Sequence, residues 1–171
     1  DRIGFSNAIY FDTFPDAVGL DPVAECSANI SAVEGMCRVL DRLRGNKALD
    51  AAVQTAKTKY YDGLEYYMTM GYVPEDKNSS SVSKTLEYAY DDWAIAQAAQ
   101  KLNRKDIYNE FIKRSENWKN VYDSSVGFTR PKSSDGTFLA KFDPLKTEGQ
   151  GFIEGNAWNY SLYVPHDPEQ M

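Results

Sequence analysis

The residues best suited to chemistry in this chain lie in one short run close to its C-terminal end. Residues 151–160 read GFIEGNAWNY, and the sequence VPHD follows at 164–167. The first run places a carboxylic acid, Glu154, among amide side chains and aromatic rings. Aromatic rings stack on the C–H faces of sugars, and a carboxylic acid can protonate the oxygen of a leaving group. This combination is typical of a carbohydrate site.

Hydrolysis of a glycosidic bond needs one carboxylic acid as proton donor and, in an inverting enzyme, a second carboxylate that activates water. The two groups then stand about 6.5–9.5 Å apart, which leaves room for the water. Glu154 is the candidate donor. We expect Phe152, Ile153 and Trp158 to surround it with apolar surface, which favours the protonated form that a donor needs.

A second group of acids lies upstream, in residues 83–93, which read SKTLEYAYDDW. The apolar positions of this stretch recur at helical spacing: Val82, Leu86, Ala89, Trp93, Ala96 and Leu102. The opposite face carries Glu87 and Asp91 among further apolar residues, and a helix that is apolar nearly all round is a buried one. Two like charges four residues apart then need partners or face a cavity. A solvated face with two incidental acids is the alternative.

These two blocks, in this order and at this separation, resemble the calcium-dependent, exo-acting α-mannosidases of glycoside hydrolase family 92. The resemblance runs from about Lys47 to Asp167 and includes four shorter blocks: Gly71–Pro74, Arg130–Pro131, Asp135–Gly136 and Phe142–Pro144. It implies a mainly α fold, with helical hairpins of an (α/α)6 toroid-type catalytic domain. The chain would be an incomplete piece of that domain.

The resemblance also assigns site residues one by one. The Glu of the Glu-Gly-Asn block is the family's proton donor, and that residue is Glu154 here. Positions expected to bind substrate are Asn156, Trp158, Asn159, His166, Asp167 and Glu87. The family usually has Gln where this chain has Asn159, which is one methylene shorter and reaches less far toward the sugar or a neighbouring side chain. For Trp158 and His166, two roles stay open on the sequence: packing inside the protein, or contact with the sugar.

The cofactor implied by the resemblance is Ca2+, bound to the 2- and 3-hydroxyls of a terminal mannose, and the general base is an Asp. We find neither the base motif nor the main calcium motifs in this sequence, so the metal ligands stay unassigned. The implied activity is an inverting exo-α-mannosidase, with α-1,2 as the expected linkage. The partners are a mannose-containing oligosaccharide or N-glycan and the remainder of the catalytic domain. The implied location is secreted or periplasmic, although no signal peptide is visible.

Two functions of other classes stay open on the sequence. The chain can bind mannosides without hydrolysing them, because it keeps the rings and amides of the motif but lacks the base. It can also be a helical module that meets another protein through an acidic, aromatic surface. Sugar binding separates the first alternative from the second.

Two helical hairpins and a small β-hairpin are the elements expected to position these residues. We treat residues 1–171 as a single partial domain in three parts. Residues 1–23 show no period, 24–122 form the two helical hairpins, and 123–171 form the β-hairpin and the site loop. The expected helices cover 24–44, 49–67, 82–102 and 107–122, and the expected strands cover 127–131 and 137–142 around a turn at 133–136.

The composition supports one globular domain, with 171 residues of which 42% are hydrophobic. The net charge of −6 and the lack of a basic cluster argue against nucleic acid. No apolar run approaches the roughly 20 residues of a membrane span. Cys26 and Cys37 share one expected helix, roughly 16 Å apart, so we expect two unpaired, buried thiols. His166 is the only histidine, which excludes zinc sites built from several histidines.

Overall fold

The computed structural model describes residues 45–147 and 149–171. The expected helix at 24–44, with Cys26 and Cys37, and the irregular stretch 1–23 therefore lie outside the described residues. The described part is mainly helical, with one small antiparallel pair of strands. It confirms the predicted fold class. The closed ring of helices implied by the resemblance stays a prediction, as does the division into three parts.

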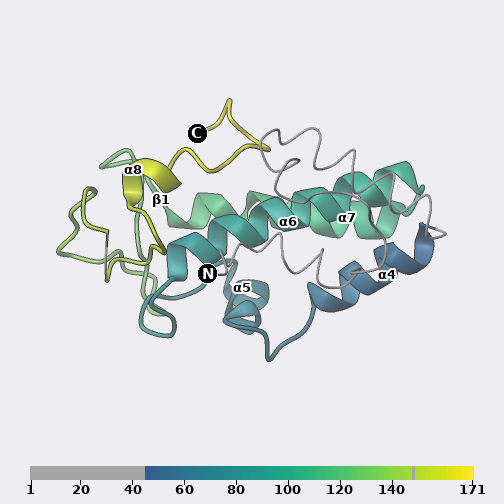
Figure 1. Ribbon diagram of the computed structural model, residues 1–171, viewed down its shortest axis with the longest axis horizontal. Helices are drawn as coiled ribbons and strands as arrows, with labels where there is room; N and C mark the ends of the chain where they lie inside the picture. The colour runs from purple at the N-terminus through teal and green to yellow at the C-terminus, as the bar shows by residue number, and fades with distance from the viewer. Residues whose placement is uncertain (1–44, 148) are drawn as a thin grey trace.

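A long helical hairpin forms the centre of the fold. Helix α6 (Ser81–Lys101) runs back along α7 (Lys105–Arg114), which continues as the 3-10 helix η1 (Ser115–Val121) (Figure 1). Asn103 makes the turn with a left-handed φ of 57°, a conformation that Asn tolerates better than most residues. The hairpin predicted for 82–122 is confirmed, although its last turns are 3-10 rather than α.

The expected single helix at 49–67 is two helices. Helix α4 (Asn46–Thr55) and helix α5 (Leu64–Met70) are separated by turns that end at Gly63, where φ is 86°. A Cβ at Gly63 would lie only 2.9 Å from Val73 Cγ1. The prediction was wrong because both helices bury apolar residues in the core beside α6. The helical spacing of apolar residues therefore continues across the break between them and resembles that of one helix.

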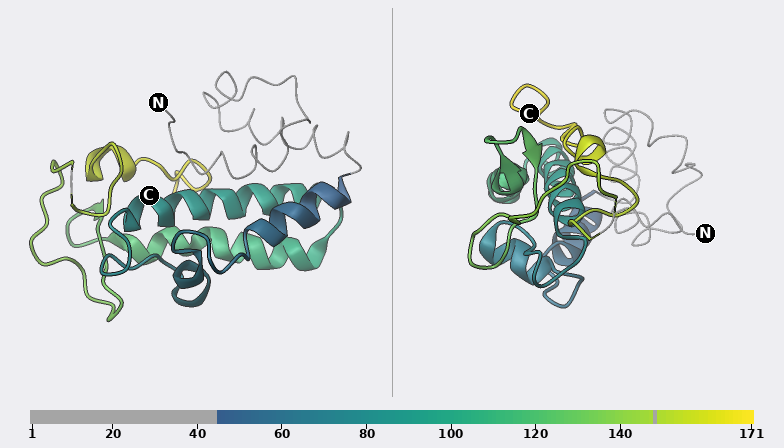
Figure 2. Two further views of the ribbon diagram at one scale, coloured as in Figure 1. Left: turned by 60° about the horizontal axis from the view of Figure 1, so that its bottom comes forward. Right: turned by 90° about the vertical axis from the view of Figure 1, so that its left-hand side faces the viewer.

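The core follows α6 along its length. One cluster joins α4, α6 and α7: Ala48, Leu49, Ala52, Ile95, Ala96, Ala98, Ala99, Ile107 and Phe111. A second cluster surrounds the first half of α6 and includes residues of the C-terminal segment: Tyr72, Val82, Leu86, Ala89, Trp118, Val121, Phe152, Ala157 and Val164. The C-terminal segment is thus held on α6 by burial of its own side chains. Figure 2 shows this segment and helix α8 (Ala157–Tyr160) along α6, on the side away from α5.

The strand pair differs in position from the expected hairpin. Strand β1 (Tyr122–Asp123) pairs antiparallel with β2 (Phe128–Thr129), while the expected turn at 133–136 carries one bridge, between Lys132 and Phe138. The residues of the first expected strand therefore pair with β1, which precedes them in the sequence, rather than with the second expected strand, which follows them. The Arg130 guanidinium explains this arrangement, because it donates to the Asp123 carboxylate at 2.7 Å and through Nε to the Leu139 carbonyl at 3.0 Å.

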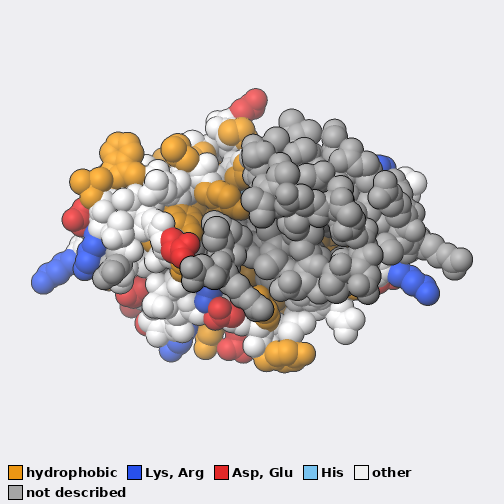
Figure 3. All heavy atoms as spheres, in the orientation of Figure 1, with side chains coloured by type: hydrophobic (Ala, Val, Ile, Leu, Met, Phe, Trp, Pro, Cys, Tyr) orange, Lys and Arg blue, Asp and Glu red, His pale blue; other side chains and the backbone are white. Residues whose placement is uncertain are grey.

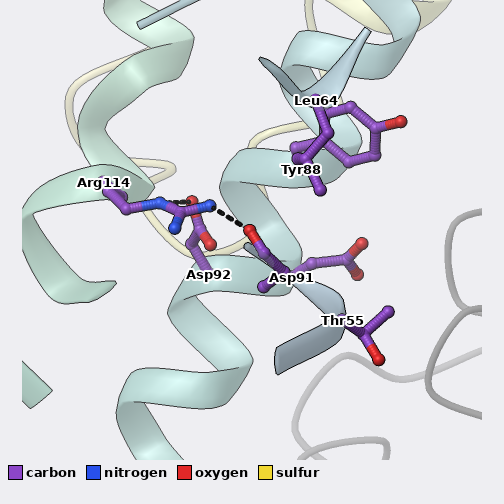
Figure 4. A pocket seen from close by; sticks show the side chains of 7 residues that line it. Thr55, Leu64, Tyr88, Asp91, Asp92 and Arg114 are labelled. Atoms are coloured by element: carbon purple, nitrogen blue, oxygen red, sulfur yellow. Dashed lines mark hydrogen bonds and ion pairs between the residues drawn. The ribbon is translucent and has the colours of Figure 1, made fainter. Parts of the chain in front are cut away.

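A buried ion pair joins the two long helices. Asp92 on α6 accepts a hydrogen bond from Arg114 Nε at 3.0 Å (Figure 4). Asp92 also accepts from the Tyr67 hydroxyl at 2.7 Å. The side chains of Asp92 and Arg114 are only 2% and 15% exposed. Burial raises the pKa of Asp92 to about 7, although the Arg114 charge acts to lower it. The pair, together with the Tyr67 hydroxyl of α5, therefore links three helices of the scaffold.

Candidate functional site

A loop that precedes α8 is bonded to the first turn of α6. The Gly151 carbonyl accepts from the amides of Val82 at 2.9 Å and Ser83 at 3.0 Å, two groups that a helix leaves without partners of its own. In return, the Ser83 hydroxyl accepts from the Ile153 amide at 3.0 Å. The loop therefore caps the N-terminus of α6. This cap fixes the loop, and with it Glu154, relative to α6, the helix that carries Glu87.

Gly151 permits this close approach. Its φ is 82°, and a Cβ there would lie 2.8 Å from Ser81 Oγ and from Val82 Cγ2 and 3.0 Å from Pro131 Cγ. Any side chain would push the loop away from α6 and adopt an unfavourable backbone conformation.

Glu154 sits in this loop with a φ of 52°, in the left-handed region that residues other than glycine rarely occupy. Such a conformation costs about 1–3 kcal/mol and is concentrated at functional sites, where the surroundings enforce it. The side chain is exposed. The proton-donor candidate is therefore presented outward on a constrained turn.

The apolar enclosure expected around Glu154 is not formed by the described residues, so that expectation is wrong. Phe152 is buried and packs on Tyr160, with ring centroids 5.6 Å apart. Ile153 and Trp158 are 38% and 56% exposed. The tight turn explains the difference, because successive side chains leave it in different directions and Phe152 alone enters the core.

The structure does bring Glu87 to the same place as Glu154. Glu87 lies one helical turn beyond Ser83 and is buried, at 8% exposure. Burial raises the pKa of Tyr160, and the negative charges of Glu87 and Glu154 raise it further. Both carboxylates therefore act on this one hydroxyl through their charge. Of the two readings of the acidic face, burial is confirmed for Glu87 and also for Asp91, at 5% exposure.

Asn156, predicted to bind substrate, works as a helix cap in this structure. Its side-chain oxygen accepts from the amides of Trp158 at 3.0 Å and Asn159 at 3.3 Å, and its amide donates to the Leu145 carbonyl at 3.3 Å. Asn159 is exposed on α8. Capping shapes the turn that carries Glu154, and a sugar contact for either amide stays a prediction.

Trp158 lies on the outer side of α8. Its ring meets Phe128 edge to face, with centroids 5.0 Å apart, and more than half of its surface is exposed. The ring lines an open groove of about 470 Å³, together with Leu162 and Met171. Figure 3 shows hydrophobic side chains at the surface over α8. Trp158 is therefore partly packed and partly free to stack.

His166 packs on α6 beside Tyr90 and Trp93. Its ring centroid is 6.0 Å from that of Tyr90 and 6.2 Å from that of Trp93, and Nε2 lies 3.0 Å from the Ser115 carbonyl oxygen. Nδ1 is buried, and among residues 45–147 and 149–171 it has no hydrogen-bond partner. Burial lowers the pKa of His166, while the hydrogen bond with the Ser115 carbonyl and the Asp167 charge act in the opposite direction. The structural reading of His166 gains support, and its sugar contact stays a prediction.

The His166 environment predicts a loss of stability on acidification. Its pKa in the fold lies below 6.5, so the unfolded chain binds more protons as pH falls through this range and the fold is weakened, by up to about 1.4 kcal/mol per pH unit for one proton. We expect the difference in unfolding free energy between His166→Asn and the original protein to shift in favour of the variant between pH 7 and pH 5. A difference that does not change with pH would contradict the burial of a neutral ring.

Metal ligands do not gather in the described part of the chain. Among residues 45–147 and 149–171, no group of three or more His, Cys, Asp and Glu side chains is placed to hold a metal ion. Within the same residues, no helix has the length and apolar character needed to cross a membrane.

Comparison with known proteins places this arrangement in a family. The sequence model of the glycosyl hydrolase family 92 catalytic domain matches residues 27–171. The chain belongs to glycosyl hydrolase family 92. The recognition made from the Glu154 and Glu87 blocks is therefore confirmed.

Solved family 92 structures share its backbone. A family GH92 α-mannosidase of Bacteroides thetaiotaomicron is 33% identical with a TM-score of 0.64, and its structure in complex with mannoimidazole has 32% identity and a TM-score of 0.66. A GH92 inverting mannosidase of Bacteroides thetaiotaomicron VPI-5482 is 32% identical with a TM-score of 0.71. The matches cover 93%, 93% and 81% of this chain but 18%, 19% and 20% of those proteins.

A curated relative extends the comparison to fungi. An uncharacterized secreted glycosidase of Arthroderma benhamiae is 24% identical in a match that covers 75% of this chain and 21% of that protein. The chain thus spans about a fifth of the length of the relatives it matches.

Proposed function

We propose that this chain forms the proton-donor part of an inverting exo-α-mannosidase, and that Glu154 is the donor. The observation that carries the proposal is the placement of Glu154. It stands on a left-handed turn that is bonded to α6 next to the buried Glu87. The family supports a mannosidase, because similar solved structures are an α-mannosidase and an inverting mannosidase.

Glu154 would donate its proton to the glycosidic oxygen while the bond from that oxygen to the sugar carbon breaks. The leaving sugar departs as an alcohol, and a water molecule attacks the opposite face of the ring, which inverts the anomeric centre. A carboxylate from polypeptide beyond this chain would take the proton of that water. Glu87, a buried carboxylate beside the loop, is suited to accept hydrogen bonds from sugar hydroxyls. The amide of Asn159 is suited to hydrogen bonds with the sugar, and the ring of Trp158 is suited to stack on it.

We propose that the calcium ion of the complete enzyme binds outside the described residues. Calcium takes six to eight oxygen ligands, and the described residues offer no cluster of three or more acids and histidines for it. These residues do not fit a calcium cage. The proposal places the calcium ligands in the remainder of the catalytic domain.

The substrate we propose is the terminal α-linked mannose of an oligosaccharide or N-glycan, with α-1,2 as the preferred linkage. The mannoimidazole bound to the similar α-mannosidase supports recognition of mannose. The relative described as a secreted glycosidase supports action outside the cell, either secreted or periplasmic.

The test is release of mannose from α-1,2-mannobiose in calcium and in chelator. We expect a complete protein containing this sequence to release β-mannose first in calcium and to lose activity in chelator, and we expect the chain alone to release none. Release of the α-anomer, or full activity in chelator, would contradict the proposal. A chain that binds mannobiose in calorimetry while the complete protein releases no mannose would point to a non-catalytic binding protein. Parallel assays with α-1,3- and α-1,6-mannobiose test the linkage.

A further inference from the structure

One aromatic side chain holds the Glu154 turn on both sides. The Tyr160 hydroxyl donates to the carbonyl of Ile153 at 2.8 Å, directly before Glu154. Its ring faces Gly155, directly after Glu154, so closely that a Cβ there would lie 3.1 Å and 3.3 Å from two ring carbons. The ring is itself packed on buried Phe152. The residues on either side of Glu154 are thus fixed by the same side chain.

The contacts of Tyr160 matter because the left-handed turn at Glu154 needs support from surrounding residues. A left-handed residue other than glycine persists only where its surroundings enforce it. The loop has one further anchor before Glu154, the bonds of Gly151 and Ile153 to the start of α6. After Glu154, the nearest constraint is the Tyr160 ring on Gly155. Removing the hydroxyl would free the peptide that leads into Glu154 while leaving the ring in place.

The Tyr160 hydroxyl also stays protonated, as its hydrogen bond to the Ile153 carbonyl requires. Burial, together with the charges of Glu87 and Glu154, raises the pKa of Tyr160, so the hydroxyl keeps its proton throughout the neutral range. A deprotonated phenol could not donate to the Ile153 carbonyl.

We propose that Tyr160 is a positioning residue for the proton donor, whose hydroxyl and ring hold the turn that aims the Glu154 carboxyl at the glycosidic oxygen. The inference rests on the proposed function of Glu154. It predicts that Tyr160 matters only where the reaction needs a well-aimed proton.

The test compares two substrates in a complete enzyme that contains this sequence. α-1,2-Mannobiose needs protonation of its leaving sugar, whereas α-mannosyl fluoride releases fluoride and needs little help. We expect Tyr160→Phe to lower kcat on mannobiose by about 10- to 100-fold, part of the 10²–10⁴ that acid catalysis supplies, with KM nearly unchanged. Activity on the fluoride should fall by less than about threefold. Tyr122→Phe, at a half-buried tyrosine on β1, is the matched control and should leave both activities unchanged.

Two further variants separate the possible failures. In a Glu154→Gln background, Tyr160→Phe should cause no further loss, because it acts through the acid. Equal loss on both substrates, a change in KM alone, or additive losses would overturn the positioning proposal. Normal mannobiose activity of Glu154→Gln would instead overturn the proposed function itself. If Tyr160→Phe fails to fold, Gly155→Ala offers the same test, because it pushes the ring while keeping the hydroxyl, and the same selective loss is expected.

Discussion

Glu154→Gln should lower kcat on α-mannobiose by about 10²–10⁴-fold in a complete enzyme that contains this sequence. The amide has nearly the shape of the acid but has no acidic proton to give to the leaving oxygen. It would keep the bonds that hold the loop, because those bonds involve the backbone of residues 151 and 153 rather than the Glu154 side chain. The loss should be much smaller on α-mannosyl fluoride, whose leaving group needs little protonation.

Glu65→Gln is the control for this variant. Glu65 is also exposed, but it lies on α5, on the other side of α6 from the site loop (Figures 1 and 2). We expect its variant to keep normal activity on both substrates. Activity of Glu154→Gln within a few fold of the original on mannobiose would show that another group donates the proton.

Arg114→Met should destabilise the fold by about 3–5 kcal/mol at pH 8, because it leaves the Asp92 carboxylate buried without its positive partner. Methionine keeps a similar length but replaces the guanidinium, whose carbon lies 4.7 Å from the centroid of the Phe111 ring, with an apolar group. The loss should be smaller at pH 5. Asp92 has a pKa of about 7 in the fold and 3.8 as its ordinary value, so it is mostly neutral at pH 5 in the folded protein.

The sign of this pH dependence follows from proton binding. Between pH 3.8 and about 7, folded Asp92 binds more protons than the unfolded chain, so its contribution to stability falls as pH rises. Without Arg114 the pKa of Asp92 rises further, and the loss extends to higher pH. Comparing unfolding free energies of variant and original protein at pH 5 and pH 8 isolates this effect from other titrating groups.

Arg104→Met is the matched control for the ion pair. Arg104 pairs with Asp50 at 3.1 Å, but these side chains are 33% and 59% exposed. A solvated pair of this kind contributes about 0–1 kcal/mol, and its loss should depend little on pH over this range. Equal effects of the two variants would show that Arg114 does not compensate a buried charge.

Local patterns predicted the elements that are long and strongly periodic. The hairpin of α6 and α7 followed from apolar residues at helical spacing with a polar break at Asn103, and burial of Glu87 and Asp91 followed from apolar neighbours all round the helix. The period failed at α4 and α5, because two separate helices packed in one core repeat the same spacing as one. It also misplaced the strand pair, which depends on the contact of Arg130 with Asp123.

The sequence by itself determined the family and the candidate proton donor, because residue types at fixed spacing carry that information without any coordinates. It could not determine how Glu154 is held. That required contacts between parts of the chain far apart in sequence: the Gly151 carbonyl with the first turn of α6, and the Ile153 amide with the Ser83 hydroxyl. The left-handed turn and the exposure of Glu154 arise from these contacts. Burial and close approach depend on which surfaces meet, and only the tertiary structure decides that.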